Sequence, residues 1–330
     1  MRSGYCDNVN KKWGGQPGAA PESIDSDLKV WWNGELVPST EIRLGVLTHT
    51  LHYGYGLFEG IRAYAQTGGG SAVFRLREHI DRMFAGAKIL EMTIPFTPEE
   101  LCKGCVDVLV ANQLSEGYIR PLTFVGEGKM GIYAPDNPVR VSISSWAWGA
   151  YLGEDALNKG VRTRISSFTR TMVNTNMVRA KVTGQYVTSI MAKSEAAATG
   201  FDEGILLDKD GYCAEGSGEN LFMVRDGVLV TPPLSSPILA GITRGSVIEL
   251  ARELGVEVVE DRFTRDDLYM ADEAFFTGTA AEITPIREVD HREIGAGTRG
   301  PITEKIQSEF FAVLRGESDR HPEWRTTYSV

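Results

Sequence analysis

The sequence has few of the features that would exclude an ordinary globular fold. Only four of its 330 residues are cysteine, at spacings that do not form a disulfide-rich framework. No apolar run approaches the ~20 residues that a bilayer-spanning helix needs. The net charge of −10 disfavours nucleic acid and anionic membranes as main partners. We therefore expect no nucleic-acid or membrane partner and a cytoplasmic location.

The N-terminal segment also lacks a targeting pattern. Residues 1–27 contain neither the continuous apolar stretch of a signal peptide nor an Arg/Ser-rich transit sequence. A polar segment of this kind is poorly ordered unless something docks it. We expect residues 1–27 to form a polar extension outside the folded domains.

Patterns that could bind a metal are weak. Cys102 and Cys105 form a C-x-x-C, but they lie in a helix-like run after Thr97 with no second Cys or His pair nearby. His49 and His52 lie three residues apart without an accompanying carboxylate or cysteine cluster. Both pairs favour structural roles, and we predict no metal site.

Length and composition indicate two domains. A chain of 330 residues exceeds one ordinary core, and 42% hydrophobic with 24% charged residues is typical of globular proteins. Residues 28–150 alternate strand-like and helix-like runs and include a hairpin at Asn33-Gly34, which predicts a small α+β domain. Residues 151–161 resemble a connection, and residues 162–330 predict a larger domain. The fold class expected is α/β.

The stretch AEGSGENLF, residues 214–222, places two carboxylates among two glycines just before a strand-like pair. Glycines suit a turn because they accept positive φ without steric cost. A turn does not require the acids Glu215 and Glu219, so the pattern raises the question of what they do. Lys181 lies 34 positions earlier, in a connection before a helix, where a lone lysine is most often a solvated surface group.

Two further turns could bind an anion. In LAGITRGSV a helix begins at Ile242-Thr243, and in FFTGTAAEIT a turn contains Thr279-Ala280. A helix N-terminus offers unpaired N–H groups and a favourable dipole, so a phosphate can bind there. A threonine at such a position is more often simply a cap, and this alternative stays open from the pattern alone.

Aromatic residues and arginines occur together in HYGYGLFEGIRAY, residues 52–64, and in GYIRPL, residues 117–122. A pocket for apolar side chains is lined with aromatics and a few polar groups, and arginine binds carboxylates in a bidentate manner. A half-buried sheet with arginines reaching to solvent explains the same pattern equally well.

Taken together, these segments resemble the pyridoxal-phosphate-dependent aminotransferases of fold type IV, most closely the bacterial branched-chain enzymes. The resemblance runs from about Trp31 to about Gly316. Its motifs, in the order that the family has, are HYG-x-G-x-FEGIR-x-Y, FR-x-REHIDR, YIRPL, WGAYLG, AK-x-x-G-x-Y, EGSGENLF, GITR and GTAAEITP. The resemblance implies pyridoxal 5'-phosphate as cofactor and a two-domain architecture whose larger domain binds it.

The resemblance also implies the roles of residues that would hold the cofactor. Lys181 matches the lysine that forms the Schiff base and moves the proton. Glu215 matches the acid that pairs with the pyridine nitrogen, which answers why a carboxylate follows the turn. The ring hydroxyl and the phosphate are matched by Tyr186, Arg82, Ile242, Thr243 and Thr279.

The substrate residues implied by the resemblance are aromatic or basic. The α-carboxylate would meet Tyr118 with the Thr279 and Ala280 amides, and Arg120 would receive the distal carboxylate of glutamate or 2-oxoglutarate. The pocket for branched side chains would comprise Tyr53, Phe58, Trp148 and Tyr151, with Arg62 in the FEGIR motif beside them. The implied substrates are L-leucine, L-isoleucine or L-valine with 2-oxoglutarate.

The resemblance implies a homodimer at least, since sites of this family borrow residues from a second subunit. We expect the loop at residues 130–138 to reach the neighbouring pocket. Fold type IV also contains D-amino acid and (R)-amine aminotransferases, which form the main alternative, and a lyase. A member that only binds the cofactor is a more distant alternative.

Overall fold

The computed structural model describes residues 28–149 and 152–330, which divide into two compact units. Of the described residues, the small unit contains 28–149, 179–186 and 311–330, and the large unit contains 152–178 and 187–310. The small unit thus includes two later segments, residues 179–186, which carry Lys181, and residues 311–330. The sequence-based expectation assigned both segments to the larger domain. The expected N-terminal extension, Cys6 and Tyr151 lie outside the described residues.

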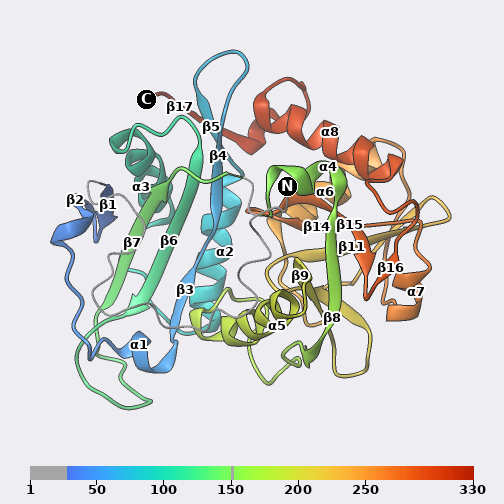
Figure 1. The fold of residues 1–330 in the computed structure, drawn as a ribbon. Helices are drawn as coiled ribbons and strands as arrows, with labels where there is room; N and C mark the ends of the chain where they lie inside the picture. Colours follow the sequence, from blue (N-terminus) through green and yellow to red (C-terminus); the bar gives the residue numbers. More distant parts are fainter. Residues whose placement is uncertain (1–27, 150–151) are drawn as a thin grey trace. The chain divides into compact units, whose positions relative to one another are not determined.

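The small unit is built on an eight-stranded sheet in the order β17-β5-β4-β6-β7-β1-β2, with β3 paired to β6. Its strands are β1 (Lys29–Trp32), β2 (Glu35–Pro38), β3 (Gly56–Phe58), β4 (Ile61–Ala65), β5 (Ser71–Phe74), β6 (Gly117–Val125), β7 (Val139–Trp146) and β17 (Arg325–Tyr328). The C-terminal strand β17 completes the sheet edge, with Tyr328 opposite Ser71. In Figure 1 this sheet runs from blue through green, with red β17 at its edge.

Helices of the small unit are α1 (His49–Tyr53), α2 (Leu76–Ile89) and α3 (Pro98–Ala111), with single turns η2 (Ser39–Glu41), η3 (Thr183–Gln185) and η4 (Pro322–Trp324). Helix α3 begins with the expected Thr97 cap: the Thr97 hydroxyl accepts from Glu100 N at 3.2 Å, and Thr97 N donates to Glu100 Oε2 at 2.7 Å. Helices α2 and α3 pack on each other and on this sheet, and both bury apolar residues in its core (Figure 1).

The large unit contains a nine-stranded mixed sheet in the order β10-β9-β8-β15-β14-β11-β12-β13, with β16 paired to β15. Its strands are β8 (Val161–Thr169), β9 (Glu203–Leu207), β10 (Cys213–Gly216), β11 (Asn220–Arg225), β12 (Val228–Thr231), β13 (Val258–Glu260), β14 (Glu273–Gly278), β15 (Glu282–Val289) and β16 (Arg292–Glu293). The neighbouring strands β14 and β11 are apolar at their centres, as strands buried on both faces require. The Phe222 and Phe275 rings of neighbouring strands stack at 5.0 Å.

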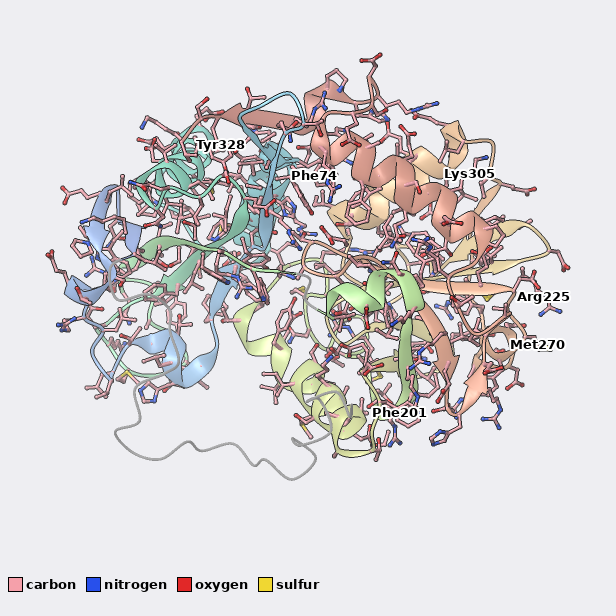
Figure 2. The ribbon with its side chains drawn as sticks, turned by 45° about the horizontal axis from the view of Figure 1, so that its top comes forward. Phe74, Phe201, Arg225, Met270, Lys305 and Tyr328 are labelled. Atoms are coloured by element: carbon pink, nitrogen blue, oxygen red, sulfur yellow. The ribbon has the colours of Figure 1, made fainter. Side chains whose placement is uncertain are left out.

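Helices α4 (Glu154–Lys159), α6 (Ile242–Glu253) and α7 (Arg265–Tyr269) belong to the large unit, as do most of α5 (Tyr186–Ala198) and α8 (Pro301–Arg315). Strand β11 ends beside α7, where the Arg225 guanidinium donates to the Met270 carbonyl at 3.0 Å (Figure 2). Among the described residues, no helix combines the length and apolar character needed to cross a membrane.

Most local predictions are confirmed, and the exceptions have physical reasons. The hairpin at Asn33-Gly34 forms, with Trp32 opposite Glu35. Residues His49–Tyr53 form a one-turn helix, α1, which ends at Gly54 with φ of +64°, so the aromatic segment from His52 is not extended throughout. The connection expected at residues 151–161 contains the short helix α4.

Candidate functional site

The segment carrying Lys181 is held against strand β3 by backbone contacts within the small unit. Phe58 N donates to Lys181 O at 3.1 Å, and Gly184 N donates to Gly54 O at 3.0 Å. A Cβ on Gly54 would lie 2.6 Å from Gly184 Cα, so this approach requires glycine. The HYG and AK-x-x-G motifs, far apart in sequence, are therefore two sides of one contact.

The Lys181 side chain lies among aromatic rings. Its Nζ donates to the Tyr186 hydroxyl at 2.7 Å and is 5.0 Å from the centroid of the Phe58 ring. The Phe58 and Tyr186 rings meet edge-on at 4.8 Å. A lysine amine beside aromatic rings and hydrogen-bonded to a hydroxyl can serve as a nucleophile toward a carbonyl compound.

Arg120 lies in the same aromatic cluster. Its guanidinium carbon is 4.8 Å from the Phe58 ring and 5.2 Å from the Tyr118 ring, and Nη2 donates to the Tyr118 hydroxyl at 3.0 Å. Arg120 Nε is buried without a hydrogen-bond partner among the described residues. A buried unpaired donor costs free energy, so this side chain is arranged to receive an acceptor such as a carboxylate.

Tyr118 links the predicted substrate residues. Its ring meets Trp148 at 4.6 Å, and Arg62 Nη2 donates to the Trp148 carbonyl at 3.3 Å. A Cβ at Gly60 would collide with the Tyr118 hydroxyl, so the glycine of FEGIR makes room for the tyrosine of YIRPL. The structure thus brings together the predicted residues Lys181, Tyr186, Phe58, Tyr118, Arg120, Trp148 and Arg62.

Tyr53 and Arg82 contact residues outside the cluster around Lys181 and Arg120. Tyr53 lies on α1, 45% exposed, with its ring against His49 and His52. Those histidines donate through Nε2 to the carbonyls of Gly131 and Val46, at 2.9 and 2.8 Å. Arg82, on α2, forms a buried ion pair with Glu59, a residue that sequence reasoning did not single out.

Glu215 lies in the large unit, where the glycine turn brings β10 and β11 together. Glu215 is paired in register with Asn220. Its Oε1 accepts from Arg170 Nε at 2.6 Å, and its Oε2 accepts from Leu239 N at 3.0 Å and Asn220 Nδ2 at 3.2 Å. Three donors, one of them the charged guanidinium of Arg170, fix the position of the carboxylate. Arg170 and Asn220 were not predicted as partners.

The remaining predicted residues of the large unit lie at element ends. Helix α6 begins at Ile242, and its N-cap Gly241 provides no side-chain cap. Thr243, 2% exposed, is in the first turn. This threonine is therefore not the N-cap, and the first-turn N–H groups can serve an anion. Thr279 and Ala280 form the turn between β14 and β15.

Glu219, the second acid of the turn, has a different environment. Burial, followed by the negative charge of Glu203, raises the pKa of Glu219 to about 8, although Lys193 opposes this. Glu203 itself is fully buried and paired with Lys193 Nζ at 2.8 Å. The Gly218 N–H donates to Glu219 Oε2 at 3.0 Å. Glu219 is therefore a buried acid that is protonated at neutral pH.

This raised pKa predicts a pH dependence of stability. The unfolded carboxyl titrates near 4.5, so the free energy of unfolding should fall as pH rises from there to about 8. Glu219→Gln removes this titration, and its thermal unfolding midpoint should fall less than that of the wild type between pH 5 and 9. The exposed control Glu35→Gln should follow the wild type. Parallel curves for wild type and Glu219→Gln would contradict the prediction.

The cysteines of the C-x-x-C lie in surroundings that disfavour reactivity. Cys105 is buried in the core of the small unit, and burial raises its pKa well above the ordinary range. Burial also raises the pKa of Cys102 to about 11. Both thiols are free. A thiolate is needed for metal binding or redox exchange, so these environments agree with a structural role.

Comparisons with known proteins identify the family. The model of amino-transferase class IV matches residues 56–289. The branched-chain-amino-acid aminotransferase of Pseudomonas aeruginosa is 51% identical over 302 residues, covering 92% of this chain and 98% of that protein. The Escherichia coli K12 enzyme of the same name is 47% identical over 296 residues, covering 89% and 96%.

Solved structures agree with these relatives. The crystal structure of the Escherichia coli branched-chain amino acid aminotransferase superposes with a TM-score of 0.89 at 46% identity, covering 91% of this chain and 98% of that one. The Thermobaculum terrenum enzyme, in its PLP-bound holo-form, gives 0.86 at 35% identity, covering 92% and 98%. These matches confirm the predicted family and two-domain fold class. The chain belongs to the class IV aminotransferases of fold type IV, whose bacterial branched-chain members it matches over nearly their whole length.

Proposed function

We propose that the protein is a branched-chain amino acid aminotransferase that uses pyridoxal 5'-phosphate to exchange amino groups between L-leucine, L-isoleucine or L-valine and 2-oxoglutarate. The observation that carries the substrate assignment is Arg120 among the Phe58 and Tyr118 rings. Aromatic faces accept an apolar branched side chain, and a guanidinium beside them accepts a distal carboxylate. Relatives at 47% and 51% identity carry the same name.

The residues present suit this cofactor. Lys181 is an amine between aromatic rings, Glu215 is a carboxylate paired with Arg170, and α6 begins without a side-chain cap. The amine suits an aldehyde, the carboxylate suits a basic ring nitrogen, and the helix N-terminus suits a phosphate. We infer that Lys181, Tyr186, Glu215, Arg82, Ile242, Thr243 and Thr279 hold the cofactor.

Bound pyridoxal phosphate supplies an electron sink for the electron pair left when the substrate Cα loses its proton. Lys181 Nζ would take that proton from the substrate Cα and later give it back, acting first as base and then as acid. The Tyr186 hydroxyl orients Lys181 Nζ through their 2.7 Å hydrogen bond. Glu215, held in place by its pair with Arg170, would stabilise the protonated form of the ring nitrogen.

We infer that the aromatic residues around Arg120 orient the substrate. We infer that Tyr118 with the Thr279 and Ala280 amides binds the α-carboxylate. We infer that the substrate side chain then meets Phe58 and Trp148, with Arg62 beside them. The two half-reactions alternate in one site, so amino donor and acceptor bind in turn.

Removal of the Arg120 guanidinium should separate the two kinds of substrate. Arg120→Ala should reduce kcat/KM for 2-oxoglutarate by roughly 30-fold or more, because a charged hydrogen-bond partner is worth about 2 kcal/mol or more. The value for L-leucine, which has no distal carboxylate, should change far less. Steady-state kinetics with each substrate varied separately measures both. Equal losses would place the action of Arg120 elsewhere.

A homodimer is part of the proposal. Its support is the apolar surface of the small unit, where Val46, Leu51, Ile132 and Tyr133 are between 65% and 92% exposed. Ile132 and Tyr133 belong to the loop expected to reach a neighbouring pocket. Exposed apolar surface of this kind marks interaction sites. Light scattering after gel filtration should give at least twice the chain mass, and a monomer would contradict the proposal.

The proposal also includes a cytoplasmic location, which cell fractionation tests.

The activity is tested by amino-group transfer to 2-oxoglutarate from three donors supplied separately. L-Leucine should give glutamate at the highest kcat/KM, and D-alanine and (R)-1-phenylethylamine should be poor donors. A preference for either of the latter would assign the protein to the D-amino acid or (R)-amine aminotransferases. No transfer from any donor, by protein that binds the cofactor, would favour a lyase or a non-catalytic member.

A further inference from the structure

Glu59 is a fully buried acid in the gap between strands β3 and β4. Its side chain is 1% exposed, and its backbone N–H donates to the Pro121 carbonyl at 2.8 Å. Burying a carboxylate costs free energy unless charged donors compensate for the lost water. The Schiff-base chemistry proposed above does not use this residue, so its retention in the core needs another explanation.

The partners of Glu59 are two residues on one face of helix α2. Arg82 Nε donates to Oε1 at 2.7 Å and Arg82 Nη2 donates to Oε2 at 2.7 Å. His79 Nδ1, three residues earlier and thus on the same face, donates to Oε2 at 2.8 Å. A bidentate pair fixes both the position and the plane of a guanidinium, and His79 fixes the carboxylate in turn.

The charge states of the three groups are defined by their surroundings. Burial alone would raise the pKa of Glu59, but the charge and hydrogen bonds of Arg82 and the hydrogen bond of His79 outweigh it and hold that pKa well below the ordinary range. Burial lowers the pKa of His79 despite Glu59, with Arg82 and Lys181 adding to the effect. His79 is therefore neutral, with its proton on Nδ1, and Glu59 and Arg82 form the single ion pair of this group.

We propose that Glu59 is a positioning residue that holds the Arg82 guanidinium in the orientation in which it meets the cofactor phosphate. The proposal rests on the proposed role of Arg82. The two hydrogen bonds from Arg82 to Glu59 use the Nε and Nη2 edge of the guanidinium. The direction of the edge that carries Nη1 is thereby fixed. Binding an anion then requires little further ordering of a long side chain, and preorganisation of this kind raises affinity. His79 contributes by bracing the carboxylate.

The test compares two ligands that differ only in the phosphate. Pyridoxal phosphate and pyridoxal are titrated into cofactor-free full-length protein, and the dissociation constants are read from the absorbance change. Glu59→Gln removes the charge and places an amide N–H₂ against one of the donors. It should weaken pyridoxal phosphate binding by at least about tenfold and pyridoxal binding by less than about twofold. Arg77→Gln, which breaks exposed ion pairs to Asp81 and Glu99, should change neither.

Two further variants keep the result decisive. Glu59→Asp retains the charge but withdraws the carboxylate by one methylene, and it replaces Glu59→Gln if that variant does not fold. Equal losses for both ligands, or no loss for either, would overturn the inference. Arg82→Gln separates the inference from the function on which it depends: a selective loss in Arg82→Gln without one in the Glu59 variants overturns the inference alone. No loss in Arg82→Gln overturns the assignment of Arg82 as well.

Discussion

Lys181→Ala should abolish amino transfer while the protein keeps its fold. Proton transfer at the substrate Cα depends on the Lys181 amine, and loss of both the nucleophile and the base should lower kcat by at least about 10⁴-fold. The segment itself is held by backbone bonds, such as Phe58 N to Lys181 O, which the substitution leaves in place. Turnover of L-leucine with 2-oxoglutarate measures the loss.

Two observations complete this test. The thermal unfolding midpoint and far-ultraviolet circular dichroism of Lys181→Ala should resemble those of the wild type. A matched control is Lys88→Ala on the exposed side of α2, which should retain full activity. Normal turnover by folded Lys181→Ala protein would contradict the mechanism.

Glu215→Gln should cost more in rate than in cofactor occupancy. The amide cannot carry the charge that keeps a ring nitrogen protonated, and its N–H₂ group would face one of the donors that now bind Glu215. We expect kcat to fall by about 10²-fold or more, comparable to removal of one preorganised electrostatic partner. The cofactor content of the purified variant, read from its visible absorbance, should fall far less.

Steady-state rates with L-leucine separate the alternatives for Glu215. Unchanged rates would show that its charge has no part in stabilising the electron sink. Loss of activity in proportion to loss of cofactor would show that Glu215 only retains the cofactor. The Glu35→Gln variant described above, altered at an exposed glutamate, provides the activity control.

Elements governed by neighbouring residues could be predicted from the sequence. The Asn33-Gly34 hairpin and the Thr97 capping box depend on residues close together in the chain, and both form as expected. Helix α1 could not be predicted, because five residues rich in histidine and tyrosine have no distinguishable period. Strand β17 owes its conformation to β5, which lies far earlier in the chain, so its own sequence carries little signal.

The same distinction between local and long-range features applies to the residues of the site. Lys181 and Glu215 were recognised from ordered motifs, but their surroundings were not. Arg170 has no motif of its own and meets Glu215 across 45 positions. Glu59 stood inside the quoted FEGIR motif, yet only the structure shows its fork with Arg82. Long-range partners of charged groups depend on strand order, which pattern reasoning did not supply.

The most direct test of the central claim is the visible spectrum of the purified protein with pyridoxal phosphate, recorded before and after L-leucine is added without an acceptor. The account predicts a Lys181-dependent band that L-leucine bleaches and 2-oxoglutarate then restores, because Lys181 releases the cofactor to the amino donor and recovers it afterwards. D-Alanine and (R)-1-phenylethylamine should leave the band largely unchanged. A band that responds only to those two compounds would contradict the branched-chain assignment, and absence of any band would contradict the cofactor itself.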